Sequence, residues 1–264
     1  MLKRLLLLFS AGLAWHGPAG AADLDALERS GTLRLLAVPS EQEKHFLSMH
    51  SATRPGFDRE VLEGFAKARR LDMVIVPVEG WDALVPALLK GRGDVIGGGF
   101  TATDARRAQI EFTDEIFPTR TVVVTRKPSP PVTSLEQLRQ AKLGTIRGSS
   151  MAEDVLNAGV PPGRLDLGIP SGGLSEALKS GRVNTAAWAL EGALLLREAD
   201  PQLELGLFLG KRASLAYGVR KEDARLREAL NGHIRMLRQT GTWNRLVVKY
   251  FGDSALELLK RARE

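Results

Sequence analysis

GRGDVIGGGFTATDARR, residues 91–107, places a short apolar run between small and charged residues. The run Val95–Gly99 is nearly continuous in apolar residues, which is typical of a strand buried on both faces of a parallel sheet. Gly91 before it suits the left-handed residue that ends a helix. The glycines at 97–99 follow the strand without the spacing of a dinucleotide fingerprint. They indicate either a bend at the strand end or backbone left bare so that a ligand approaches closely.

The alternation of strands and helices extends on both sides of this stretch. Residues 33–38 and 73–78 have the composition of further buried strands. Residues 61–68 and 81–90 carry apolar side chains at helical spacing, and Asp58 is expected to cap the first of these helices. Strands that alternate with amphipathic helices predict an α/β fold with a parallel sheet.

A proline-rich segment divides the chain. After a strand-like run at 121–125, the segment Arg126–Pro131 contains three prolines, which break both helix and strand. We therefore expect lobe 1 to comprise 22–126 and 214–264, and lobe 2 to comprise 127–213. The elements expected in lobe 2 are strands at 143–146, 185–190 and 203–209, and helices after Ser150, at 174–179 and at 191–198.

The N-terminus has the pattern of a secretory signal. Basic Lys3 and Arg4 precede the apolar run 5–14. Ala19–Ala21 supplies a small-residue cleavage site, so residues 1–21 are predicted to be a signal peptide. An uncleaved membrane anchor is the alternative, but the apolar run is shorter than the ~20 residues that a membrane span needs. The chain contains no cysteine for a lipid anchor, and the expected location is the periplasm.

Charge and composition narrow the possible functions. With 264 residues and 44% hydrophobic composition, the chain is large enough to bury one or two cores. The net charge of +6 falls to about +4 without the predicted signal peptide and forms no basic run, so nucleic acid is not an expected partner. The four histidines have no ligand-like spacing, and the sequence has neither a G-x-S-x-G elbow nor a G-K-S/T loop. We therefore expect no metal, no cofactor and no catalytic residue.

Short motifs in a fixed order run through the chain from Gly31 to Gly252. They are GTLR at 31–34, GFD at 56–58, WDALVPAL at 81–88, GRGDVI at 91–96, FTATDARR at 100–107, FTD at 112–114, GSS at 148–150, EALKSGRV at 176–183 and GTW at 241–243. With these motifs the chain resembles the bacterial extracellular solute-binding proteins of the polar amino-acid receptor type. The resemblance implies a two-lobed periplasmic-binding-protein fold of type II, in which two hinge-linked α/β lobes close around a ligand.

The resemblance also implies a set of ligand-binding residues. Arg106 matches the arginine that holds the ligand's carboxylate in the family, and a guanidinium pairs with a carboxylate through two parallel hydrogen bonds. Thr101 and Gly99 match further contacts from the first lobe. Ser149 and Ser150 match a hydroxyl pair at a helix start, where free N–H groups also favour an anion. Without the family, Arg106 would be interpreted as a solvated helix charge and the serines as helix caps.

Four further positions bear on how the rest of the ligand, including any ammonium group, would be bound. Phe46 falls where the family often has an aromatic ring against the ligand, although it suits a core position equally well. The acid that neutralises an ammonium group in the family is replaced by Ala189, so an ordinary α-amino acid would bind poorly unless Glu191 takes over. Trp188 is expected either to contact the ligand or to pack between sheet and helix.

These features predict a monomeric receptor that captures a small anionic, amino-acid-like metabolite and delivers it to an inner-membrane ABC permease. The expected receptor performs no chemistry on its ligand. Two alternatives stay open at this point. One is a dehydratase-like enzyme acting on cyclic carboxylates, with Glu191 as its acidic residue. The other is a ligand-sensing accessory protein of a different periplasmic partner.

Overall fold

The computed structural model describes residues 23–39, 45–48, 53–170, 172–253, 255–256 and 259. The predicted signal peptide at 1–21 lies outside these described residues. Within the described ranges, no helix is both long and apolar enough to cross a membrane.

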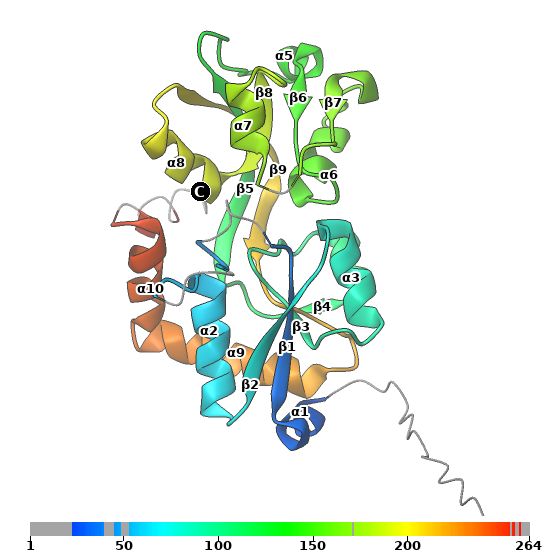
Figure 1. Ribbon diagram of the computed structural model, residues 1–264, viewed down its shortest axis with the longest axis vertical. Helices are drawn as coiled ribbons and strands as arrows, with labels where there is room; N and C mark the ends of the chain where they lie inside the picture. The colour runs from blue at the N-terminus through cyan, green and yellow to red at the C-terminus, as the bar shows by residue number, and fades with distance from the viewer. Residues whose placement is uncertain are drawn as a thin grey trace, which may run out of the picture.

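Two α/β lobes lie one above the other in Figure 1, and each is built on a five-stranded sheet. The lower sheet has the order β2 (Asp72–Pro77), β1 (Thr32–Ala37), β3 (Val95–Ile96), β10 (Gly218–Val219) and β4 (Glu111–Phe112). β1 pairs in parallel with β2 and β3, whereas β10 is antiparallel to both of its neighbours. The helices of this lobe are α1 (Leu24–Ser30), α2 (Phe57–Ala68), α3 (Trp81–Leu89), α4 (Asp104–Arg107), α9 (Ala224–Gln239) and α10 (Thr242–Phe251).

The upper lobe contains the second sheet. Its order is β7 (Leu165–Asp166), β6 (Leu143–Gly144), β8 (Thr185–Ala189), β5 (Phe117–Arg126) and β9 (Leu203–Leu215). Its helices are α5 (Leu135–Gln140), α6 (Ser150–Asn157), η1 (Pro162–Arg164), α7 (Leu174–Lys179) and α8 (Leu190–Ala199). β6 pairs in parallel with β7 and β8, and β5 is antiparallel to β8 and β9. The two-lobed α/β fold expected from the sequence is therefore confirmed.

β5 and β9 connect the two lobes. They run side by side between the lobes in Figure 1, and their pairing extends from Phe117 with Leu215 to Arg126 with Leu203. The sequence placed residues 117–126 in lobe 1, but this strand forms its ladder hydrogen bonds in the second sheet. Residues 117–126 therefore pair with strands of the upper sheet. The expected lobe boundaries stay a prediction.

Two local expectations are wrong around the glycine-rich stretch. The strand expected at 95–99 ends at Ile96, because Gly98 and Gly99 have φ angles of 81° and 83°, outside the extended region. Asp58 does not cap helix α2, which begins at Phe57 after an N-cap glycine without a side-chain hydrogen bond. The Asp58 side chain is instead buried and points to the amides of Gly98 and Gly99.

Apolar packing continues from one lobe into the other. A single cluster of buried side chains includes Leu36 and Trp81 from lobe 1 together with Ile146 and Trp188 from lobe 2. Because apolar surface is removed from water along the whole contact, this cluster stabilises the closed arrangement of the lobes.

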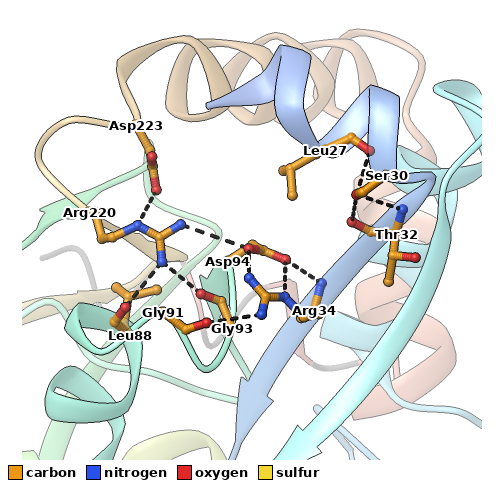
Figure 2. A network of polar contacts seen from close by, with 10 residues as sticks. All are labelled: Leu27, Ser30, Thr32, Arg34, Leu88, Gly91, Gly93, Asp94, Arg220 and Asp223. Carbon is orange, nitrogen blue, oxygen red and sulfur yellow. Dashed lines mark hydrogen bonds and ion pairs between the residues drawn. The ribbon is translucent and has the colours of Figure 1, made fainter. Parts of the chain in front are cut away.

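An ionic network around the buried Asp94 includes residues of the GRGD motif at 91–94 (Figure 2). The backbone N–H, Nε and Nη2 of Arg34 donate to the Asp94 carboxylate at 2.8, 3.0 and 2.6 Å. Arg220 Nη1 donates to the Gly93 carbonyl oxygen at 2.7 Å, while its Nε lies 2.8 Å from Asp223 Oδ2. Arg220 Nη2 is 3.8 Å from Asp94 Oδ1. Asp94 thus ties the loop before β3 to β1 and to the residue that follows β10.

Candidate functional site

A cavity of about 40 Å³ lies between the lobes. The eight residues expected from the sequence to bind a ligand all line it: Phe46, Gly99, Thr101, Arg106, Ser149, Ser150, Trp188 and Glu191. The structure thus brings together residues that are far apart in the sequence, and their roles in binding stay predictions. The sequence did not single out several further lining residues: His45, Trp81, Met151, Leu215 and Phe251.

Arg106 is buried in the wall of this cavity. Its Nη1 donates to the Thr101 carbonyl oxygen at 2.8 Å, and its Nη2 donates to the Gly148 carbonyl oxygen of the opposite lobe at 3.0 Å. The guanidinium also lies 4.1 Å from the centre of the Phe100 ring. Burial lowers the pKa of Arg106 to about 10, partly offset by Glu153, so the group is still charged at neutral pH. The interpretation of Arg106 as a solvated helix charge is wrong.

No carboxylate in the described part of the chain forms an ion pair with Arg106, whose hydrogen bonds go to neutral carbonyl oxygens. A charged donor forms its strongest hydrogen bonds with a charged acceptor. Arg106 is therefore a buried cation that can gain energy by binding an anion in the cavity.

The two serines at the start of α6 have different surroundings. Ser149 Oγ donates to the Ile146 carbonyl oxygen at 2.7 Å and accepts from the Ala152 amide at 3.2 Å, so this hydroxyl caps the helix. Ser150 Oγ donates instead to Thr101 Oγ1 across the lobes at 3.0 Å. A ligand between the lobes would therefore meet Ser150 and Thr101 together.

Aromatic side chains form the apolar wall of the cavity. Phe46 lies 5.0 Å from the Phe251 ring and 5.6 Å from the Phe117 ring, measured between ring centres. Phe46 therefore belongs to the core of lobe 1 and also lines the cavity, while its contact with a ligand stays a prediction. Trp188 likewise packs in the apolar cluster and lines the cavity.

Glu191 is an acidic residue on the cavity wall, in the first turn of α8. Its Oε2 accepts a hydrogen bond of 2.7 Å from Thr119 Oγ1 on β5. Burial raises the pKa of Glu191 to about 7, against the smaller lowering by its own backbone amide and Thr119. Ala189 also lines the cavity and has no carboxylate. The acidic side chain on this part of the wall is that of Glu191, two residues further along the chain.

Replacing Glu191 with glutamine should change how stability depends on pH. The folded-state pKa is about 7 against an ordinary value of 4.5, so the folded protein binds an extra proton between these values. The contribution of Glu191 to stability is therefore largest at low pH and is lost as the pH rises through 7. Chemical denaturation at pH 5 and pH 8 should show the stability of the glutamine variant, relative to wild type, rising by about 1–3 kcal/mol across this range. Equal differences at both pH values would contradict the pKa shift.

Gly148 marks a tight contact between the lobes. It has a φ of 70°, and a Cβ atom added there would lie 2.6 Å from the Asp82 backbone nitrogen at the start of α3. Gly148→Ala should therefore hold the lobes apart and weaken ligand affinity at least about tenfold, because closure then carries an added free-energy cost. Small-angle scattering with saturating ligand should give a larger radius of gyration than for wild type.

Gly181→Ala is the matched control for this variant. Gly181 has a similar φ of 72° in lobe 2, but a Cβ atom there would meet nothing within 4 Å. This control should keep the closed dimensions and the affinity. If both variants behave alike, backbone strain and not the contact with Asp82 is responsible.

A wider groove of about 800 Å³ lies outside the cavity, along α6, β5 and β9. It shares Thr101, Ser150, Met151 and Ala189 with the cavity. Its own lining includes Arg120, Phe208, Lys211 and Arg212. Ser150 and Thr101, whose hydroxyl groups form a hydrogen bond, therefore line both the cavity and this outer groove.

Two lobes joined by paired strands, with a cavity between them lined from both sides, define a two-lobed ligand-binding protein. The model of the bacterial extracellular solute-binding proteins, family 3, matches residues 40–253, so the chain belongs to this family. The family resemblance based on the sequence motifs is thereby confirmed.

Individual relatives agree with this assignment. The histidine-binding periplasmic protein of Escherichia coli (strain K12) is 28% identical over 209 residues, which cover 74% of this chain and 78% of the relative. Among solved structures, a mutant of ArgBP from T. maritima superimposes with a TM-score of 0.77 at 24% identity, covering 87% of this chain and 99% of the other. The ancestral amino acid-binding protein AncCDT-1, a precursor of cyclohexadienyl dehydratase, gives 0.74 at 21% identity, covering 86% and 98%. These two structural likenesses show the shared fold.

Proposed function

We propose that this protein is a periplasmic receptor that binds a small carboxylate metabolite between its lobes and delivers it to an ABC permease. Arg106 supports the proposal most, because it is a buried guanidinium on the cavity wall with only neutral carbonyl oxygens as hydrogen-bond acceptors among the described residues. A ligand carboxylate would replace the contact with Gly148 by a stronger, charge-assisted pair. In this proposal residues 1–21 are a signal peptide, and the mature receptor is a monomer.

In this proposal the other residues on the cavity wall contact the rest of the ligand. Thr101 and Ser150 offer hydroxyl groups beside Arg106, and the backbone of Gly99 allows close approach. Phe46 and Trp188 enclose an apolar body. Glu191 then faces the ligand's second polar group, because Ala189 supplies none. The relative named for binding histidine supports an amino-acid-like ligand.

Native mass spectrometry of protein purified from the periplasm of its own host tests this proposal. We expect a bound small molecule in a one-to-one complex, and its release and identification should reveal a carboxylate. Calorimetry of the emptied protein against organic acids and amino acids should then give micromolar or tighter binding for the matching compound. A co-purified ligand without an acidic group, together with no binding of any acid in the panel, would overturn the proposal.

The dehydratase-like alternative depends on Glu191, whose pKa of about 7 suits proton transfer near neutral pH. The family match and the histidine-binding relative favour binding without reaction. Long incubation of the protein with cyclic carboxylates, followed by mass spectrometry, separates the two functions. Unaltered compounds support the receptor, whereas loss of water from one of them supports the enzyme.

A further inference from the structure

The loop that brings Gly99 to the cavity is held by a buried carboxylate. Asp58 Oδ2 accepts hydrogen bonds from the amides of Gly98 and Gly99, each at 2.8 Å. Both glycines have φ angles above 80°, which L residues adopt only under strain. Asp58 is 3% exposed and comes from helix α2, so one carboxylate oxygen fixes two successive amides of a loop about 40 residues away in sequence.

The second carboxylate oxygen is joined to the part of the chain that returns from lobe 2. The Tyr217 hydroxyl donates to Asp58 Oδ1 at 3.3 Å, and the tyrosine is 1% exposed. The Tyr217 amide donates to Thr113 Oγ1 at 3.0 Å, and its carbonyl oxygen accepts from the Thr113 amide at 3.0 Å. Both residues lie beside the strands that connect the lobes. Asp58 thus links α2, the glycine loop and the connection between the lobes.

We propose that Asp58 is a positioning residue of the ligand site, whose carboxylate holds the Gly98–Gly99 backbone in the conformation that places Gly99 and Thr101 on the cavity wall. This role rests on the proposed function in one respect: the effect of Asp58 on ligand affinity requires that a ligand binds in the cavity. The hydrogen-bond geometry of the loop stands independently of any ligand.

Protonation of Asp58 should loosen the loop. Burial raises the pKa of Asp58 to about 6, and the hydrogen bonds from Gly99, Gly98 and Tyr217 offset this only in part. The groups that face its carboxylate are these two amides from the glycine loop and the Tyr217 hydroxyl, while its own amide donates to the Phe46 carbonyl oxygen. A neutral carboxyl oxygen accepts weaker hydrogen bonds than a carboxylate. The two amides should therefore be held firmly at neutral pH and less firmly at pH 5.

NMR of the isotopically labelled protein without added ligand tests the geometry. The chemical shifts of the Gly98 and Gly99 amide protons should change together with pH, with a midpoint near pH 6 in wild type that reports the protonation of Asp58. Asp58→Asn should abolish this titration and leave both amides with partial protection from hydrogen exchange, because its neutral amide oxygen can still accept both bonds but accepts them more weakly than a carboxylate. Asp58→Ala should lower the protection of both amides at least tenfold. Tyr217→Phe is the matched control, because it removes the contact with Oδ1 and should leave both amides protected.

Calorimetry with L-histidine and L-arginine as probes then tests the consequence for binding. If either probe binds wild type at pH 7.5, Asp58→Ala should weaken it at least tenfold, and Asp58→Asn should stay within threefold. If Asp58→Ala fails to fold, the wild-type and asparagine titrations decide. Glycine amide chemical shifts that do not titrate in wild type, or that still titrate near pH 6 in the asparagine variant, would overturn the positioning role. Failure of both probes to bind would count against an amino-acid ligand for the proposed function and not against the positioning role, because the NMR result needs no ligand.

Discussion

Replacing Arg106 with alanine is expected to weaken ligand binding at least about 100-fold, equivalent to about 2.7 kcal/mol. The guanidinium is buried, lies on the cavity wall and is free of ion pairs with the described carboxylates. A ligand carboxylate bound to it would form two charge-assisted hydrogen bonds away from water. Without the guanidinium, that carboxylate would lose its counter-charge in a buried site. Calorimetry with the ligand identified by native mass spectrometry measures the effect.

Two companion variants sharpen this test. Arg107→Ala removes the neighbouring charge, which is exposed and lies over the Phe112 ring, so it should leave affinity nearly unchanged. Arg106→Lys keeps the charge but cannot form the two parallel hydrogen bonds, so its affinity should fall between wild type and alanine. Wild-type affinity in the Arg106→Ala variant would show that the anion does not bind at this residue.

Replacing Asp94 with alanine is expected to lower the free energy of unfolding by about 3–5 kcal/mol. The Asp94 side chain is fully buried and accepts three hydrogen bonds from Arg34, while Arg220 lies buried beside it (Figure 2). Removal of the carboxylate leaves Arg220 with Asp223 as its remaining acidic neighbour within ion-pair distance among the described residues. A buried charge that loses a partner retains its desolvation penalty, which accounts for the size of the effect.

Urea denaturation followed by circular dichroism measures this loss. Asp25→Ala provides the control, because Asp25 pairs with Arg225 where both side chains are about half exposed. That change should lower stability by less than about 1 kcal/mol. An Asp94→Ala variant as stable as the Asp25→Ala variant would mean that the network of Figure 2 contributes little to folding.

The arrangement of strands and helices follows largely from apolar periodicity. Residues 32–37 and 72–77 form parallel strands within one residue of their expected positions. The predicted burial largely holds for 32–37, but it is wrong for 72–77, which is the edge strand of its sheet and contains only exposed and half-buried residues. The other local predictions that were wrong concern residues whose hydrogen-bond partners are far away in the sequence. Asp58 has the local pattern of a helix cap, yet its carboxylate bonds to a loop that only the folded chain brings near. No local pattern contains that information.

The candidate site was likewise predicted only in part from the sequence. The family motifs point to Arg106 and the two serines, and all three line the cavity. Trp81 and Phe251 were missed because each sits in an amphipathic helix, where a large apolar residue is expected to serve the core. Their place on the cavity wall depends on the lobes coming together, which no spacing within one helix can reveal.

A crystal structure of the protein with its own ligand tests the central claim most directly. We predict that the ligand lies between the lobes with a carboxylate within hydrogen-bond distance of the Arg106 guanidinium and with Ser150 and Thr101 beside it. A ligand bound in the outer groove along Arg120 and Lys211, with Arg106 still bonded to the Gly148 carbonyl oxygen, would contradict this account.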